Sequence, residues 1–174
     1  MGTGVRDFTY IRLKIVYHNF LYFMLIVDLI RTDSLNSDFQ ELVKLLDADL
    51  RIRDGADHIF YAQFNKIDAI KNVLVAYLDN VPVGCGAFKP FSEGAVEIKR
   101  MFVEQDYRGK GIAQQILSSL EKWASELGYK TAVLETGQKQ QEAIQLYHKA
   151  GYMNIPNYGQ YIGIDNSICM QKLL

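Results

Sequence analysis

The spacing of hydrophobic residues along the chain alternates between that of a helix and that of a strand. Ser37 begins a first helical stretch, and Gln40 stands three residues later, which is the spacing of a capping box. Asp54 and Gly55 end this stretch. Apolar residues three and four positions apart predict further helices over residues 112–127 and 139–150, with a weaker one over residues 57–65.

Between these helices, short apolar runs rich in β-branched residues predict strands. They cover residues 25–30, 73–78, 81–88, 95–103, 131–134 and 167–173. Asp79 and Asn80, a turn-forming pair, join two of them in a β-hairpin. The order β-α-α-β-β-β-α-β-α-β indicates a single α/β domain (an α+β mixed sheet) covered by helices, with parallel pairing where a helix joins two strands.

Composition and net charge exclude several classes of protein. The chain has 174 residues, 49% of them hydrophobic and 22% charged, as expected for one folded domain. Its formal net charge of -1 argues against a general binder of nucleic acid. Cys85 and Cys169 have no Cys-x-x-Cys or Cys/His spacing, so we expect reduced thiols and no metal site.

The N-terminal stretch over residues 11–30 is rich in large apolar side chains. Charged residues interrupt it, among them Arg12, Lys14 and Asp28, so its uninterrupted apolar part is far shorter than the ~20 residues of a membrane span. No small-x-small cleavage site follows it. We therefore expect a cytoplasmic protein that has no membrane partner.

Arg108-Gly-Lys-Gly-Ile-Ala113 joins a predicted strand to a predicted helix and carries the clearest chemical signal. The first N–H groups of a helix have no partners within it and lie at the positive end of its dipole, which favours anions. Gly109, Gly111 and Ala113 leave room for several N–H groups to close on a phosphate, while Arg108 and Lys110 add positive charge. A ligand that carries a pyrophosphate fits this site.

Two other phosphate motifs match this segment poorly. Glu104 stands where a P-loop needs its first glycine, and Gly111 stands where it needs Ser or Thr. Gln114 occupies the third glycine position of a dinucleotide fingerprint. Nucleotide or NAD binding through this turn is therefore the least favoured of three hypotheses.

A longer signature covers the same segment: Arg or Gln, two residues, Gly, one residue, then Gly or Ala. Arg108, Gly111 and Ala113 match it, and the flanking segments that also match are Glu97-Ile-Lys-Arg-Met-Phe-Val103, Leu134-Glu-Thr136 and Ala143-Ile-Gln-Leu-Tyr-His-Lys-Ala-Gly-Tyr152. With these motifs in this order, the chain resembles the GNAT superfamily, whose members transfer an acyl group from acyl-coenzyme A to an amine. The resemblance implies a GNAT-like fold over residues 24–174: a central, mostly antiparallel sheet with one parallel, splayed pair, flanked by helices. Residues 1–23 are then an N-terminal extension.

The resemblance also implies acetyl-CoA as the co-substrate, with no metal. By analogy, the main chain around Met101 and Val103 holds the pantetheine arm and the acetyl carbonyl, and the segment from Arg108 holds the pyrophosphate. Gln140 stands where many members have an Asn that contacts the cofactor. The cofactor-binding residues implied in this way are Met101, Phe102, Val103, Arg108, Gly109, Lys110, Gly111, Ile112, Ala113 and Gln140.

An amine like that of Lys is protonated at pH 7, and its neutral form costs about 3.4 pKa units, or ~4.6 kcal/mol. The site therefore needs a proton acceptor. Glu97 lies six residues before Val103, where family members that use a strand carboxylate carry theirs, so we take it as the candidate base, acting through water. Because Glu97 and Lys99 alternate with Ile98, a solvated face of a strand is the other interpretation.

Tyr147 matches the family tyrosine that donates a hydrogen bond or a proton to the departing thiolate. Complete proton transfer from a phenol to a thiolate is uphill by about 1.5 pKa units, or ~2 kcal/mol, so we favour a hydrogen-bond donor. Core packing on an amphipathic helix is the alternative role for Tyr147.

The leading hypothesis is an N-acetyltransferase that moves an acetyl group from acetyl-CoA to a primary amine of a small molecule or peptide, by direct attack in a ternary complex. A catalytically silent CoA-binding module with a sensing or assembly role is the alternative. Dimers are common among similar proteins, so we include a homodimer among the expected partners and exclude nucleic acid.

Overall fold

The computed structural model describes residues 27–55, 61, 63, 67 and 70–174. The predicted N-terminal extension, residues 1–23, lies outside this part of the chain, as does most of the weak helix predicted over residues 57–65.

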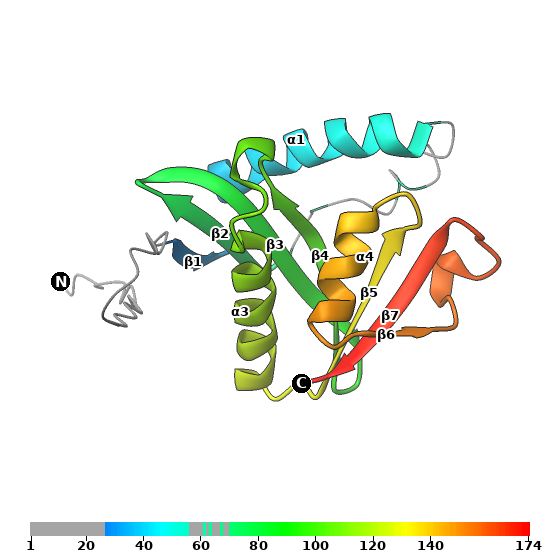
Figure 1. The fold of residues 1–174 in the computed structure, drawn as a ribbon. Coiled ribbons are helices and arrows are strands. Elements are labelled where there is room, and N and C mark those ends of the chain that lie inside the picture. Colours follow the sequence, from blue (N-terminus) through cyan, green and yellow to red (C-terminus); the bar gives the residue numbers. More distant parts are fainter. Residues whose placement is uncertain (1–26, 56–60, 62, 64–66, 68–69) are drawn as a thin grey trace, which may run out of the picture.

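Seven strands form one sheet in the order β1-β2-β3-β4-β5-β7-β6 (Figure 1). Among the strands of the described residues, only β4 and β5 are parallel neighbours, which confirms the predicted mostly antiparallel sheet with one parallel pair. The strands are β1 (Asp28–Thr32), β2 (Asn72–Leu78), β3 (Val81–Ser92), β4 (Ala95–Val103), β5 (Thr131–Gly137), β6 (Met153–Ile155) and β7 (Ser167–Leu173).

Helices cover both faces of the sheet. They are α1 (Ser37–Asp54), α3 (Ile112–Glu126) and α4 (Gln141–Lys149). The described residues also form two short 3-10 turns, η2 (Gln105–Tyr107) and η3 (Gly159–Tyr161). None of the helices among the described residues combines the length and apolar character that a membrane crossing needs.

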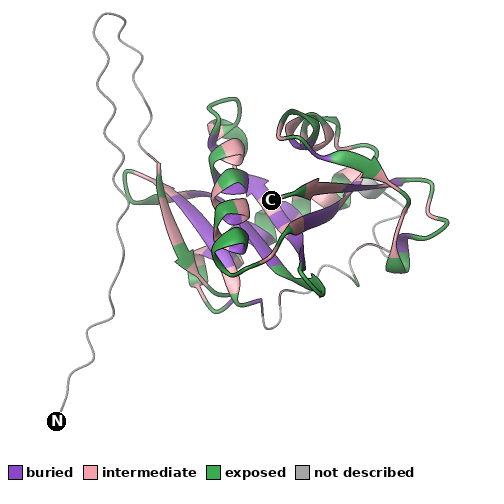
Figure 2. Ribbon diagram, turned by 90° about the horizontal axis from the view of Figure 1, so that it is seen from below, coloured by how far each residue is buried: buried purple, intermediate pink, exposed green. Residues whose placement is uncertain are grey.

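The alternation of side chains along a strand explains this layering. In β2, Val73 and Val75 belong to the hydrophobic cluster under α1, whereas Leu74 and Ala76 belong to the cluster under α3. Successive residues of a strand point to opposite faces, so β2 contributes to both cores. The central strands are accordingly buried between the helical layers (Figure 2).

Two pairing predictions are wrong, because the strands predicted on either side of α4, β5 and β7, are antiparallel, and so are those on either side of α1. Helix α1 joins β1 to β2, yet these strands pair antiparallel, with Thr32 opposite Val73. The N–H of Ser34 donates to the carbonyl of Ile70 at 2.9 Å, so the chain has come back to the end of the sheet that it left. A connection that returns to its starting end places the next strand antiparallel, whether or not it contains a helix.

The order of helices and strands predicted from the sequence also omits one strand, β6. This strand of three residues pairs with β7 at the edge of the sheet, so β7 lies between β5 and β6 and is antiparallel to both. Met153 and Asn154 are exposed. A strand this short, without buried apolar alternation, leaves little signal in the sequence.

The start of α1 differs from the predicted capping box. Asn36 is the N-cap, and its Oδ1 accepts a hydrogen bond from the N–H of Phe39 at 2.9 Å. The side chain of Gln40 donates to the carbonyl of Ser34 at 2.9 Å. The helix begins at Ser37 as predicted, but Asn36 caps it because its side-chain oxygen already satisfies the N–H of Phe39.

The parallel pair diverges soon after it begins. Ala95–Glu97 of β4 pair with Thr131–Val133 of β5, and the pairing ends there, while β4 stays paired with β3 as far as Val103. The predicted splay is therefore present, and it lies near the middle of the sheet.

A bulge in the β3–β4 pairing lies beside the splay. The register shifts between Cys85 and Ala87, and on β4 the nearby Arg100 has a φ of 58°, a left-handed conformation that is uncommon for a residue with a side chain. The buried Arg100 donates from Nη1 to Oδ1 of Asp47 at 2.8 Å. This ion pair ties α1 to the bulge.

Candidate active site

A cleft of about 450 Å³ opens where β4 leaves β5. The end of β4, the loop that follows it, α1 and the first turns of α3 and α4 form its walls. All ten predicted cofactor-binding residues line this cleft except Lys110. The structure therefore brings together residues that span Met101 to Gln140 in the sequence.

The loop before α3 has the backbone that an anion site needs. Gly109 has a φ of 75° and Gly111 a φ of 78°, and a Cβ placed at either residue meets no atom within 4 Å. Gly111 is the N-cap of α3, and it has no side chain with which to cap the first helical N–H groups. These N–H groups are available to an anion at the positive end of the helix dipole.

The two cations of this loop point in different directions. Lys110 donates from Nζ to the carbonyl of Asp106 at 3.0 Å and lies 5.0 Å from the centre of the Tyr107 ring. Arg108 lines the cleft, where its Nε donates to the carbonyl of Val103 at 2.9 Å. Arg108 is therefore the side-chain cation of this loop that faces the cleft.

Arg108 also belongs to a chain of charged groups along the cleft. Its Nη2 lies 3.1 Å from Oδ2 of Asp49, and Oδ1 of Asp49 lies 3.1 Å from Nε of Arg53. Arg53 in turn pairs with Glu142 in the first turn of α4. Partial burial of Asp49 opposes its ionisation, but the hydrogen bonds from Arg53 and Arg108 outweigh this effect and lower the pKa of the Asp49 carboxyl.

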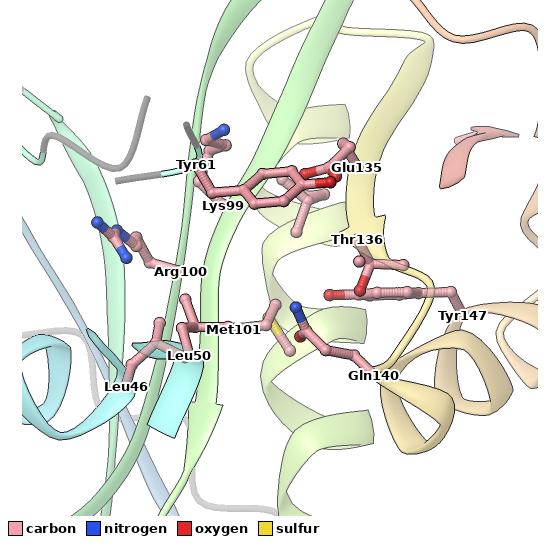
Figure 3. Close-up of a pocket in the computed structure, with 12 residues that line it drawn as sticks. Leu46, Leu50, Tyr61, Lys99, Arg100, Met101, Glu135, Thr136, Gln140 and Tyr147 are labelled. Carbon is pink, nitrogen blue, oxygen red and sulfur yellow. The ribbon is translucent and has the colours of Figure 1, made fainter. Parts of the chain in front are cut away.

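A second, smaller cavity of about 80 Å³ adjoins the cleft (Figure 3). Its walls come from β4 and β5 on the two sides of the splay, and from α1 and α4. We call this smaller cavity the acceptor pocket. Five residues line both it and the cleft: Leu46, Leu50, Met101, Gln140 and Tyr147.

Tyr147 lies at the junction of the cleft and the acceptor pocket. Its side chain is buried, and its ring packs edge-to-face on Tyr152 at 5.8 Å. Burial, with a further contribution from the negative charge of Glu135, raises the pKa of the Tyr147 hydroxyl. Tyr147 therefore packs in the core and lines both cavities, and its hydroxyl keeps its proton at neutral pH.

Glu97 is buried rather than solvated, being 3% exposed, so the interpretation as a solvated strand face is wrong. Its Oε2 lies 3.2 Å from Nζ of Lys89, and its Oε1 lies 3.4 Å from Nζ of Lys99. The hydroxyl of Tyr158 also donates to Oε1 at 3.2 Å. Glu97 itself lines neither the cleft nor the acceptor pocket.

Several charged residues of the two cavities were not singled out by the sequence pattern, among them Lys99, Glu135 and Asp49. Lys99 and Glu135 line the acceptor pocket from β4 and β5, and Asp49 lines the cleft from α1. Glu135 lies within the matched segment Leu134-Glu-Thr136, where an acidic residue in an otherwise apolar strand was the available signal. Lys99 and Asp49 carried no such signal.

The cysteines do not form a nucleophilic site. Cys85 and Cys169 are both buried and free, as predicted. Burial raises the pKa of Cys85 to about 12, and burial likewise raises the pKa of Cys169, so both thiols stay protonated at neutral pH. Within the described part of the chain, no group of His, Cys, Asp and Glu side chains is arranged to hold a metal ion.

Comparisons with known proteins agree with this geometry. The sequence pattern of the acetyltransferase (GNAT) family matches residues 39–152. An IAA acetyltransferase from Azospirillum brasilense is 38% identical over 102 residues, which cover 58% of this chain and 67% of that relative.

Solved structures share the fold. A putative acyl-CoA N-acyltransferase from Klebsiella pneumoniae has a TM-score of 0.73 at 25% identity, covering 86% of this chain and 99% of that one. A GNAT family acetyltransferase from Elizabethkingia anophelis, solved with acetyl-CoA bound, has a TM-score of 0.61 at 19% identity, covering 85% of this chain and 98% of that one.

Proposed function

Because the chain belongs to the acetyltransferase (GNAT) family, we propose that it transfers an acetyl group from acetyl-CoA to a primary amine of a small molecule or peptide. The observation that carries this proposal is the meeting of a long cleft and a small pocket at Met101, Gln140 and Tyr147. A donor in the cleft and an acceptor in the pocket can meet there in one ternary complex, without an acyl-enzyme step.

The residues of the cleft fit a long ligand with a pyrophosphate. We assign the pyrophosphate to the free N–H groups at the start of α3 and to the guanidinium of Arg108, and the pantetheine arm to the open edge of β4. Arg108 already holds the Val103 carbonyl, which makes Met101 the favoured main-chain contact for the arm. When bound, acetyl-CoA supplies the activated acetyl group and a thiolate leaving group.

The proposed role of Tyr147 is to donate a hydrogen bond to the charge that develops on sulfur as the thioester breaks. Its raised pKa keeps the donor protonated across the pH range of an assay. Glu97 remains our candidate proton acceptor. Because it does not line the pocket, its proton would arrive through water or through Lys99, whose ammonium lies 3.4 Å from Oε1.

Replacement of Tyr147 by Phe tests this role. We expect kcat to fall by about 100-fold, as for the loss of one donor to developing charge, with little change in the KM for acetyl-CoA. Tyr152→Phe is the matched control, because Tyr152 packs on Tyr147 but lines neither cavity, and its kcat should equal that of the wild type. Full kcat in a folded Tyr147→Phe protein would remove Tyr147 from the mechanism.

Release of free coenzyme A thiol from acetyl-CoA, measured over a panel of amines and peptides, tests the function as a whole. Amine-dependent release with an equal amount of acetylated amine supports the transferase. Tight binding of CoA with no release on any amine would instead indicate the silent CoA-binding module.

A further inference from the structure

The acceptor pocket has opposite charges on its two walls. Lys99 comes from β4 and Glu135 from β5, on the two sides of the splay (Figure 3). A pocket that receives only an ammonium group gains from Glu135 but loses from Lys99, because like charges repel. An acceptor that carries both an amine and an anionic group uses both walls.

Lys99 has the capacity to bind such an anion. Its Nζ lies 3.4 Å from Oε1 of Glu97 and 3.4 Å from the hydroxyl of Tyr161, both longer than a good N–H···O hydrogen bond. Glu97 also accepts from Lys89, so its one carboxylate is shared between two ammonium groups. An ammonium has three donors, and a carboxylate in the pocket would give Lys99 a shorter, charge-assisted bond.

Glu135 lines the same pocket as Tyr147. Its carboxylate is half-buried in the pocket wall, and its charge contributes to the raised pKa of Tyr147 at the junction with the cleft. An ammonium drawn toward Glu135 therefore lies in the pocket that Tyr147 also lines. Lys99 lines the same pocket from β4.

We propose that the acceptor is an α-amino acid, with its carboxylate held by Lys99 and its amine directed toward Glu135 and Tyr147. This inference rests on the proposed acetyl transfer and names its substrate class. The amine nitrogen forms the new bond to the acetyl carbon and the thioester C–S bond breaks. One proton of the substrate ammonium ends on the sulfur, a second goes to water, and the products are an N-acetyl amino acid and free coenzyme A.

The test compares each amino acid with two analogues that lack its carboxylate: its amide and the amine left after decarboxylation. The amide is the sharper of the two, because an α-amine beside an amide has a reference pKa of about 7.7–8.0 and is more often neutral at pH 7. On amine reactivity alone the amide should be the better acceptor. We expect the wild type instead to favour the amino acid in kcat/KM by about tenfold or more.

Lys99→Gln should reduce this preference to a ratio near one, whatever it does to the rate with the amines. Lys89→Gln is the matched control: it also removes an ammonium from Glu97, but Lys89 does not line the pocket. Its ratio of amino acid to amide should equal that of the wild type. Lys99→Arg, which keeps the charge, should retain much of the preference.

A calorimetric titration of each acceptor into the CoA-loaded full chain separates this inference from the proposed function. Turnover of amines with no preference for the amino acid, or an equal loss in Lys89→Gln and Lys99→Gln, would overturn the inference and leave acetyl transfer intact. Amino acid binding that depends on Lys99, without turnover of any amine, would support the pocket assignment and contradict the transferase. Neither binding nor turnover of any amino acid would overturn the inference.

Discussion

Glu97 lies behind Lys99 on β4, held by Lys89, Lys99 and Tyr158, and outside the wall of the acceptor pocket. A carboxylate in this position can accept a proton only through an intermediate group. As the base, Glu97 would therefore act through water or through Lys99.

Replacement of Glu97 by Gln separates the two roles through a pH profile of kcat/KM. If Glu97 accepts the proton, the deficit should be about 100-fold near pH 7 and should shrink toward pH 10, where a Lys-type amine becomes neutral by itself. Glu93→Gln, in the exposed turn before β4, is the control and should follow the wild type. A deficit that is the same at every pH would show that Glu97 only supports the structure.

Asp49 forms an ion pair with Arg108, the residue to which we assign a phosphate of the cofactor. Since its folded pKa is lowered, its contribution to stability is present above the pKa of the unfolded chain and is lost as the pH falls through the folded value, in the acid range. At neutral pH the Asp49–Arg108 pair is therefore intact, and under our assignment it competes with the phosphate for Arg108.

Asp49→Asn should consequently tighten CoA binding. The pair is about one-third exposed on both sides, so we expect a decrease in the Kd of up to about fivefold, as for the loss of an ion pair worth ~1 kcal/mol or less. Calorimetric titration measures it, with Asp38→Asn, which is paired with Tyr77, as the control on the same helix. Weaker binding in Asp49→Asn would mean that Asp49 positions Arg108 for the phosphate.

The site residues that could be predicted from the sequence differ from those that could not in whether a local turn or a contact between distant elements positions them. Arg108, Gly109 and Gly111 act through one local turn, so their spacing alone carries the signal. Glu135 and Asp49 acquire their roles only when β5 and α1 meet other elements, and no local pattern records that meeting.

At the scale of elements, the sequence predicts the pairing of two strands correctly where a single short turn joins them. Asp79 and Asn80 both have positive φ and join β2 to β3, as the turn-forming pair predicts. The antiparallel pairing of β1 with β2 depends instead on where a long connection returns, which periodicity cannot show.

Two glycines of β3 set how closely α3 and the β4 bulge approach it. A Cβ at Gly86 would lie 2.6 Å from Sδ of Met101, 2.8 Å from a methyl of Ile116 and 2.9 Å from a methyl of Leu120. A Cβ at Gly84 would lie 2.8 Å from the carbonyl oxygen of Phe102. These glycines therefore allow β4 to lie where it forms the cleft.

Gly86→Ala should destabilise the fold by about 1–3 kcal/mol through overpacking, and it should also weaken CoA binding because Met101 has to move. Chemical denaturation measures the first effect and calorimetric titration the second. Ser118→Ala, at an exposed position of α3, is the control and should stay within about 0.5 kcal/mol of the wild type. An unchanged stability of Gly86→Ala would show that the packing here relaxes without cost.

At the scale of the whole molecule, the site exists because a parallel pair of strands diverges inside a largely antiparallel sheet. The splay separates β4 from β5, the loop before α3 closes the cleft, and α4 places Tyr147 at the junction. The family resemblance predicted this splay. The helix and strand pattern alone predicted a mixed sheet but not the splay, because a gap between paired strands leaves no periodic signal in the sequence.

The most direct test of the account is a set of initial rates in which acetyl-CoA and an accepted amine are varied together. Direct attack in a ternary complex predicts double-reciprocal lines that intersect, with free thiol and acetylated amine formed in equal amounts. Parallel lines would contradict it, because they indicate an acyl-enzyme that forms before the amine binds.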